Sequence, residues 1–254
     1  MTVARTLVLA IETSNPSASA DGAGASGVAL GRLGAGGAVD VLGRELLRSR
    51  GSAAGGAGVA ARGGHDDDLL PAIDRVFARL GADAGELAWV AVSAGPGGYT
   101  GLRVACAAGA MVALARGAKC VRVPSALVVL ESVDQSLRLE GPIAVALASK
   151  NDSAWVQVFE GGAEVGAGSL LNAEGLERVG GRGVRTLIAD RFLPEAMRAG
   201  TERMGMRVVE PVYSAEACLR VAARLTPVDP AELVPLYPRE PDAVTLWREK
   251  KGTK

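Results

Sequence analysis

The chain has 254 residues, enough for one large domain or for two smaller lobes that each bury a core. Its 28 basic residues balance 28 acidic residues without a large basic block, which excludes a strongly electrostatic nucleic-acid binder. Three widely spaced cysteines form neither a disulfide framework nor a CxxC metal motif. The apolar run 104–115 is too short to cross a bilayer core of ~30 Å. We therefore expect a cytoplasmic protein without a membrane span.

The first half predicts three strands followed by helix, strand and helix. Apolar runs at 6–12, 27–33 and 40–47 indicate the strands, and the glycine-rich residues 51–64 indicate a mobile loop. The first helix is expected to follow three aspartates at 66–68 and to end at Gly81, with its apolar residues on one stripe. A short strand at 89–93 then leads into a second helix, which Thr100 is expected to cap and Gly117 to close.

The second half partly repeats this order. Runs at 142–148, 154–159 and 164–171 predict three strands, with a hairpin turn at 161–162. A strand at 184–189, a helix at 193–199, a strand at 206–209 and a helix at 214–225, capped by Ser214, are expected after them. The pattern predicts a duplicated α/β architecture in which a three-strand meander leads each lobe. The expected lobes are 1–120 and 121–254, with the C-terminal segment returning to the first lobe.

A glycine-rich loop, AGPGGYTG at 94–101, lies between the strand and the second helix. Such a loop can hold an anion at the helix N-terminus. It does not match the P-loop pattern GxxxxGK[ST], and the dinucleotide pattern GxGxxG from Gly95 breaks at Thr100. Both an anion site and a tight turn that lets the helix pack closely therefore remain open.

The second helix carries small side chains on nearly every side, because seven of its residues between Ala105 and Ala115 are alanine or glycine. One face of small side chains can pack on the chain's own sheet. A second face of this kind indicates a further packing partner beyond that sheet.

Four segments in the right order resemble the TsaB (YeaZ) family, whose members are non-catalytic subunits of the bacterial machinery for threonylcarbamoyl modification of adenosine in tRNA. They are IETS at 11–14, GHDDDLLPAID at 64–74, AGPGGYTGLRVA at 94–105 and PLYPRE at 235–240. The residues that match the family's glycine motif are Gly95, Pro96, Gly97, Tyr99, Thr100, Gly101 and Arg103. The chain departs from the family at Ala148-Ser149-Lys150, where Asp-Ala-Arg is common.

This resemblance implies an actin/Hsp70/sugar-kinase (ASKHA) type fold. In that fold the turn after the first strand, here Glu12, Thr13 and Ser14, reaches toward a nucleotide phosphate. The resemblance also implies pairing with a TsaD-type catalytic paralogue, self-pairing as a homodimer when that partner is absent, a TsaE-type ATPase in the assembly, and tRNA contact only through the complex. The residues expected at the partner interface lie on the two first-lobe helices or just before them, namely His65, Leu69, Leu70, Ile73, Ala105, Ala108, Gly109 and Val112.

Three classes of function can be compared against these residues: a metallopeptidase, a stand-alone ATP-binding enzyme and a scaffold. A metallopeptidase is disfavoured because the chain has one histidine and no clustered cysteines, so we expect neither a metal site nor catalytic residues. A stand-alone ATP-binding kinase or transferase of the same superfold remains the alternative to a scaffold. No resident cofactor is expected, although ATP or ADP with Mg²⁺ at an interface of the complex stays open.

Overall fold

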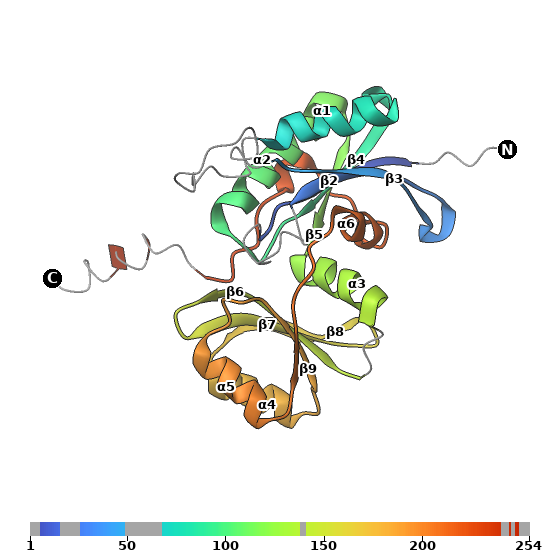
Figure 1. The fold of residues 1–254 in the computed structure, drawn as a ribbon. Helices are drawn as coiled ribbons and strands as arrows, with labels where there is room; N and C mark the ends of the chain where they lie inside the picture. Colours follow the sequence, from blue (N-terminus) through green and yellow to red (C-terminus); the bar gives the residue numbers. More distant parts are fainter. Residues whose placement is uncertain are drawn as a thin grey trace, which may run out of the picture.

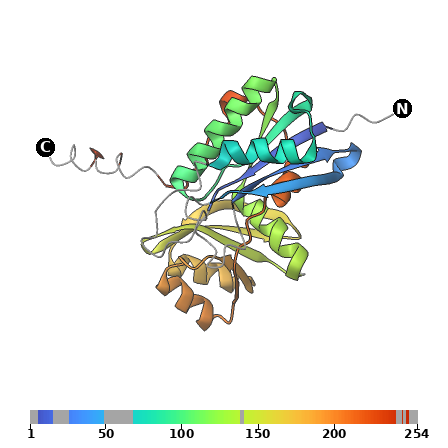
Figure 2. The same ribbon diagram turned by 45° about the horizontal axis from the view of Figure 1, so that its top comes forward.

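The computed structural model describes residues 6–15, 26–48, 68–137, 141–239, 244 and 247–248. Two five-stranded sheets make up its two lobes (Figures 1 and 2). The first sheet has the order β3-β2-β1-β4-β5, and its strands are β1 (Thr6–Glu12), β2 (Gly27–Leu33), β3 (Val39–Leu46), β4 (Leu87–Ser93) and β5 (Lys119–Val123). The second has the order β10-β9-β6-β7-β8, and its strands are β6 (Ile143–Lys150), β7 (Ser153–Glu160), β8 (Ala163–Leu171), β9 (Thr186–Ala189) and β10 (Arg207–Val209).

Both sheets have the same connectivity. In the first, β1 pairs antiparallel with β2 and parallel with β4; in the second, β6 pairs antiparallel with β7 and parallel with β9. A meander of three strands therefore leads each sheet, and a parallel strand joins the other side of its first member. This repeat confirms the expected duplicated α/β, ASKHA-like architecture.

Helices cover both faces of the first sheet. On one face lie α1 (Leu69–Leu80) and α2 (Tyr99–Arg116), which share a core with alternate residues of β1 and β2. On the other face lies α6 (Ala215–Ala222), together with part of α3 (Ser125–Leu137). The other side of α3 packs against β6 and β7, so this helix is sandwiched between the two sheets (Figure 1). The outer face of the second sheet carries α4 (Ala173–Gly181) and α5 (Glu195–Arg203).

Most predicted elements are confirmed within a few residues, but one strand, two α-helices and the short 3-10 helices were missed, and one cap was wrong. The missed strand is β5, and the missed α-helices are α3 and α4. The second helix begins at Tyr99 after Gly98, so Thr100 lies inside its first turn and does not cap it. Gly81 and Gly117 end α1 and α2 in the left-handed conformation, as expected, with φ of 59° and 65°. The loop predicted at 51–64 lies outside the described residues.

The chain returns to the first lobe after β10. Helix α6 packs on the first sheet, and Cys120 and Val228 then form an antiparallel bridge beside β5. The short helix η4 (Pro230–Glu232) follows and lies against α2. The last part of this path brings residues 233–239 next to the glycine-rich loop.

Candidate functional site

The glycine-rich loop between β4 and α2 is packed against the turn that follows β1. Gly95 has a φ of 113°, a conformation that side chains disfavour. Gly97 is required for a different reason, because a Cβ built there would lie 2.1 Å from the carbonyl oxygen of Ser14. The same oxygen accepts a hydrogen bond from the Gly98 amide at 2.6 Å. The loop is therefore a close backbone-to-backbone junction between the two turns.

The turn after β1 directs its polar groups inward. Glu12 is fully buried, and its Oε1 accepts hydrogen bonds from the backbone amide of Ser14 at 2.7 Å and from the Ser14 hydroxyl at 2.6 Å. Its Oε2 is buried without a hydrogen-bond partner among the described residues. Burial raises the pKa of Glu12, and the bonds from Ser14 oppose the rise. Thr13 is also buried, and its hydroxyl donates to the carbonyl of Gly101 at 3.2 Å.

This geometry bears on the nucleotide site that the fold type implies. A carboxyl group must be charged and reachable to hold a hydrated Mg²⁺, and hydroxyls must be free to bind phosphate oxygens. Burial favours the neutral form of Glu12, Ser14 is engaged by that carboxyl, and the glycine-rich loop lies against the Ser14 carbonyl. The residues at this turn do not fit a nucleotide phosphate in this arrangement, and we derive no step through one.

A cluster of polar residues joins the two lobes next to this turn. The side-chain amide of Asn15 donates through Nδ2 to Asp190 Oδ2 at 2.9 Å and to the hydroxyl of Tyr213 at 3.2 Å. Asp190 follows β9 of the second sheet and accepts from the backbone amide of Phe192 at 2.9 Å. Burial raises the pKa of both Asp190 and Tyr213. Local sequence pattern does not predict this cluster, because Asp190 and Tyr213 lie 175 and 198 residues from Asn15 along the chain.

The PLYPRE motif also bridges the lobes. The amide of Leu236 donates to the carbonyl of Ala94 at 2.7 Å, which places this segment beside the glycine-rich loop. Arg239 donates to the Ser153 carbonyl and hydroxyl of the second lobe, each at 3.0 Å, and also to the Ala148 carbonyl. The segment thus ties the glycine-rich loop to the turn between β6 and β7.

The residues expected at the partner interface divide into two groups. Leu69, Ile73, Ala105 and Gly109 belong to or face the core between the helices and the first sheet, and Ala108 is only 9% exposed in the same core. Val112 is partly buried against this core. Leu70, in contrast, is 51% exposed on α1. His65 lies outside the described residues.

A different set of residues forms the outward face of α2. Tyr99, Met111 and Leu114 are 51%, 65% and 66% exposed, and Arg103 and Ala107 are also exposed. They recur at a spacing of three or four residues, so they lie along one side of the helix. Large apolar side chains on one outward stripe are typical of a surface that another protein covers.

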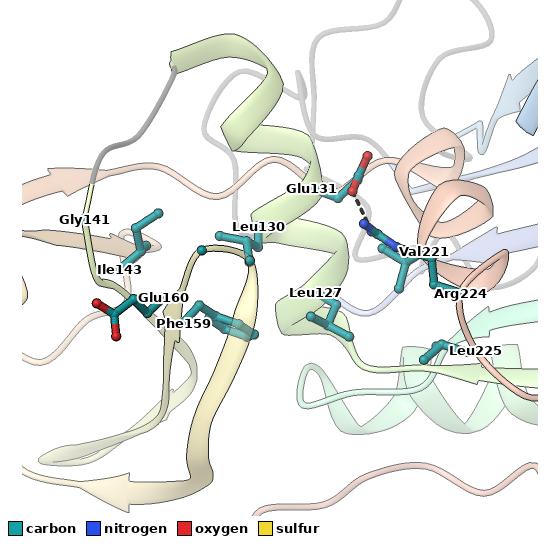
Figure 3. Close-up of a pocket in the computed structure, with 12 residues that line it drawn as sticks. Leu127, Leu130, Glu131, Gly141, Ile143, Phe159, Glu160, Val221, Arg224 and Leu225 are labelled. Atoms are coloured by element: carbon teal, nitrogen blue, oxygen red, sulfur yellow. Dashed lines mark hydrogen bonds and ion pairs between the residues drawn. The ribbon is translucent and has the colours of Figure 1, made fainter. Parts of the chain in front are cut away.

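A cavity of about 410 Å³ opens at the junction of the lobes, on the side of α3 and α6 (Figure 3). Leu127 and Leu130 of α3 face Phe159 at the end of β7, and Leu225 lies beyond α6. Glu131 at its rim is bound by Arg224 at 2.6 Å and by Arg220 at 3.0 Å. These carboxylate and guanidinium groups are engaged with one another, and the rest of the lining combines apolar side chains with Glu160 and the glycines after β7.

Within the described ranges, no three histidine, cysteine or acidic side chains come together as a candidate metal site. Over the same ranges, no helix combines the length and apolar character that a membrane span requires.

Comparison with known proteins finds a family model that matches just under half of the chain. Residues 55–174 match the model of the TsaD family, described as tRNA N6-adenosine threonylcarbamoyltransferase. No curated protein sequence matches the chain.

Two solved structures from Pseudomonas aeruginosa share the fold. One, described as an uncharacterized protein with similarity to peptidase YEAZ, has a TM-score of 0.64 and 21% identity, and the match covers 92% of this chain and 100% of the other. The other, described as YeaZ, has a TM-score of 0.62 and 20% identity over 91% and 99% of the two chains. The two structures show that this chain shares their fold, and the family model over residues 55–174 agrees with the resemblance of the sequence to the TsaB (YeaZ) family.

Proposed function

We propose that the chain is a non-catalytic subunit that pairs with a TsaD-type catalytic paralogue in the threonylcarbamoyl modification of adenosine in tRNA. The family match and the fold support a role in this modification. The observation that carries the pairing is the outward face of α2, where Met111 and Leu114 are two-thirds exposed. Covering such side chains removes apolar area from water, which favours association by ~25 cal/mol per Å² of area covered.

The lack of intrinsic catalysis follows from the chemistry available to the chain. Its sequence holds one histidine, and its buried Glu12 is bound by Ser14 rather than presented to a substrate. The alternative of a stand-alone ATP-dependent kinase or transferase requires free donors for phosphate at the turn after β1. Thr13 and Ser14 direct their hydroxyls to Gly101 and Glu12 instead, so the geometry favours the scaffold.

The other partners are part of the same proposal. When the paralogue is absent, the chain would pair with itself as a homodimer. A TsaE-type ATPase and the tRNA would join the assembly, and any nucleotide with Mg²⁺ would lie at an interface between subunits. The balanced charge of 28 basic and 28 acidic residues agrees with tRNA contact through the complex rather than through this chain alone.

The pairing is tested by placing a charge on the outward face of α2. Met111→Asp and Leu114→Asp should weaken binding to the purified paralogue at least about tenfold, because a carboxylate would be buried in an apolar contact. Val165→Asp is the matched control, since Val165 is 50% exposed on β8 of the other lobe. Ala108→Arg is unsuitable, because Ala108 lies in the core and its replacement would unfold the first lobe. Wild-type affinity of both α2 variants, with all variants folded, would remove the proposed interface.

A further inference from the structure

The segment 233–239, which we call the C-terminal strap, runs along α2 toward its N-terminus (Figure 1). Leu233 is buried in the core beside Gly109 in the middle of α2. Leu236 then reaches the loop at Ala94, and Tyr237 stacks on Tyr99 with ring centroids 5.0 Å apart. The strap therefore runs from the buried side of α2 at Gly109 to the outward face at Tyr99, where the helix begins.

The strap adds exposed side chains to that face. Val234 and Tyr237 are 51% and 38% exposed, and Tyr99 beneath Tyr237 is 51% exposed. The guanidinium of Arg103 lies 5.3 Å from the centroid of the Tyr99 ring and donates to its hydroxyl at 3.2 Å. Each ring is thus held in place before any partner arrives, which lowers the entropy lost on binding. Tyrosine and arginine are also the residue types most enriched among dominant interface contacts.

The charge of this surface indicates what covers it. Helix α2 and the strap contain three arginines, Arg103, Arg116 and Arg239, and no acidic residue. Arg239 is occupied by carbonyl groups of the second lobe. Arg103 has no carboxylate partner among the described residues. A second copy of the same face would bring only further cations from α2 and the strap, whereas a partner with a carboxylate at this position would complement it.

We propose that Tyr99, Arg103 and Tyr237 form a preorganised anchor that extends the partner surface from α2 onto the C-terminal strap. Its occupant is the catalytic paralogue, a heterologous chain that presents apolar side chains and a carboxylate to Arg103. This inference rests on the proposed function. It adds that part of the partner surface comes from a segment more than 110 residues beyond the end of α2.

Titration of the full-length chain with the purified paralogue, at two salt concentrations, tests the anchor. Tyr237→Ser should weaken binding at least about tenfold, and Tyr237→Phe, which keeps the stacked ring, should stay within about twofold. Arg103→Glu should weaken binding more than Arg103→Gln, and Arg103→Gln should bind with less salt dependence than the wild type. Arg103 is exposed, so both of its variants should keep the wild-type melting temperature.

The outcomes separate this inference from the proposed function. If the variants of Tyr237 and Arg103 bind like the wild type while Met111→Asp does not, the anchor is refuted and the α2 interface stands. If Met111→Asp also binds like the wild type, both fail. If Arg103→Glu weakens only self-association, as measured by light scattering, the occupant is a second copy and the inference is overturned.

Discussion

Replacing Gly97 with alanine should destabilise the first lobe, because the junction between the glycine-rich loop and the turn after β1 has no room for a Cβ. That atom would lie 2.1 Å from the Ser14 carbonyl oxygen and 2.9 Å from the Ser14 carbonyl carbon. The turn would have to retreat by ~1 Å to restore ordinary contact. Backbone displacements of this kind cost ~1–3 kcal/mol, and weakening the 2.6 Å bond from Gly98 to Ser14 costs ~1 kcal/mol more.

The free energy of unfolding should therefore fall by ~2–4 kcal/mol, which is a decrease of ~5–15 °C in melting temperature for a chain of this size. Calorimetry or urea unfolding measures it. Gly98→Ala is the neighbouring control: its Cβ would lie 3.6 Å from the Ser14 oxygen, and φ of −67° suits alanine. This control should be neutral or stabilising by ~0.4–1 kcal/mol. A Gly97→Ala protein that melts within 2 °C of the wild type, on the order of 0.5–1 kcal/mol, would refute the close junction.

Three further predictions concern buried and paired groups. Burial raises the pKa of Glu12 in the folded state above the ordinary value of 4.5, so the free energy of unfolding should fall as the pH rises above 4.5. In urea unfolding, Glu12→Gln should lose less stability than the wild type between pH 5 and pH 8. Equal losses for the two proteins would contradict this. Arg75 pairs with Asp68 at 2.7 Å and lowers the pKa of the Asp68 carboxyl group to about 2. Arg75→Gln should therefore lower the free energy of unfolding by ~1–3 kcal/mol at neutral pH. That difference should shrink as pH falls from 3.8 toward 2, and a constant difference would argue against the ion pair. Burial raises the pKa of the thiols of Cys106 and Cys120 to about 12 and about 11, so a thiol reagent at pH 8 should label them only as the protein opens, and rapid labelling of the folded chain would contradict their burial.

Sequence periodicity predicts the strands and the glycine-dependent turns well, because those features are local. The run TLVLAIE predicts a buried strand through its β-branched and apolar residues, and Gly81 and Gly117 end helices through their own left-handed conformation. The strand β5 is harder to recognise, since its sequence KCVRV alternates charge with short apolar residues over only five positions. Helix α3 lies between two sheets and is apolar on more than one side, so it lacks a clear amphipathic stripe.

The direction of each side chain on α2 could not be predicted from spacing. Every residue between 101 and 115 except Arg103 is apolar, so no stripe distinguishes the face toward the sheet from the face toward solvent. The structure shows that Ala105 and Ala108 face the core, whereas Met111 and Leu114 face outward. The contacts of Asn15 with Asp190 and of Tyr237 with Tyr99 join distant parts of the chain, and local pattern contains no information on them.

The most direct measurement of the central claim is threonylcarbamoyl transfer to tRNA in a purified system. Threonylcarbamoyl-adenylate, tRNA and the catalytic paralogue are supplied with this chain, without it, and with its Met111→Asp variant. We predict that the wild-type chain raises the rate of modified adenosine formation, that the variant does not, and that the chain without the paralogue forms none. Modification by this chain alone, or a rate with the paralogue that does not change when the chain is added, would contradict the account.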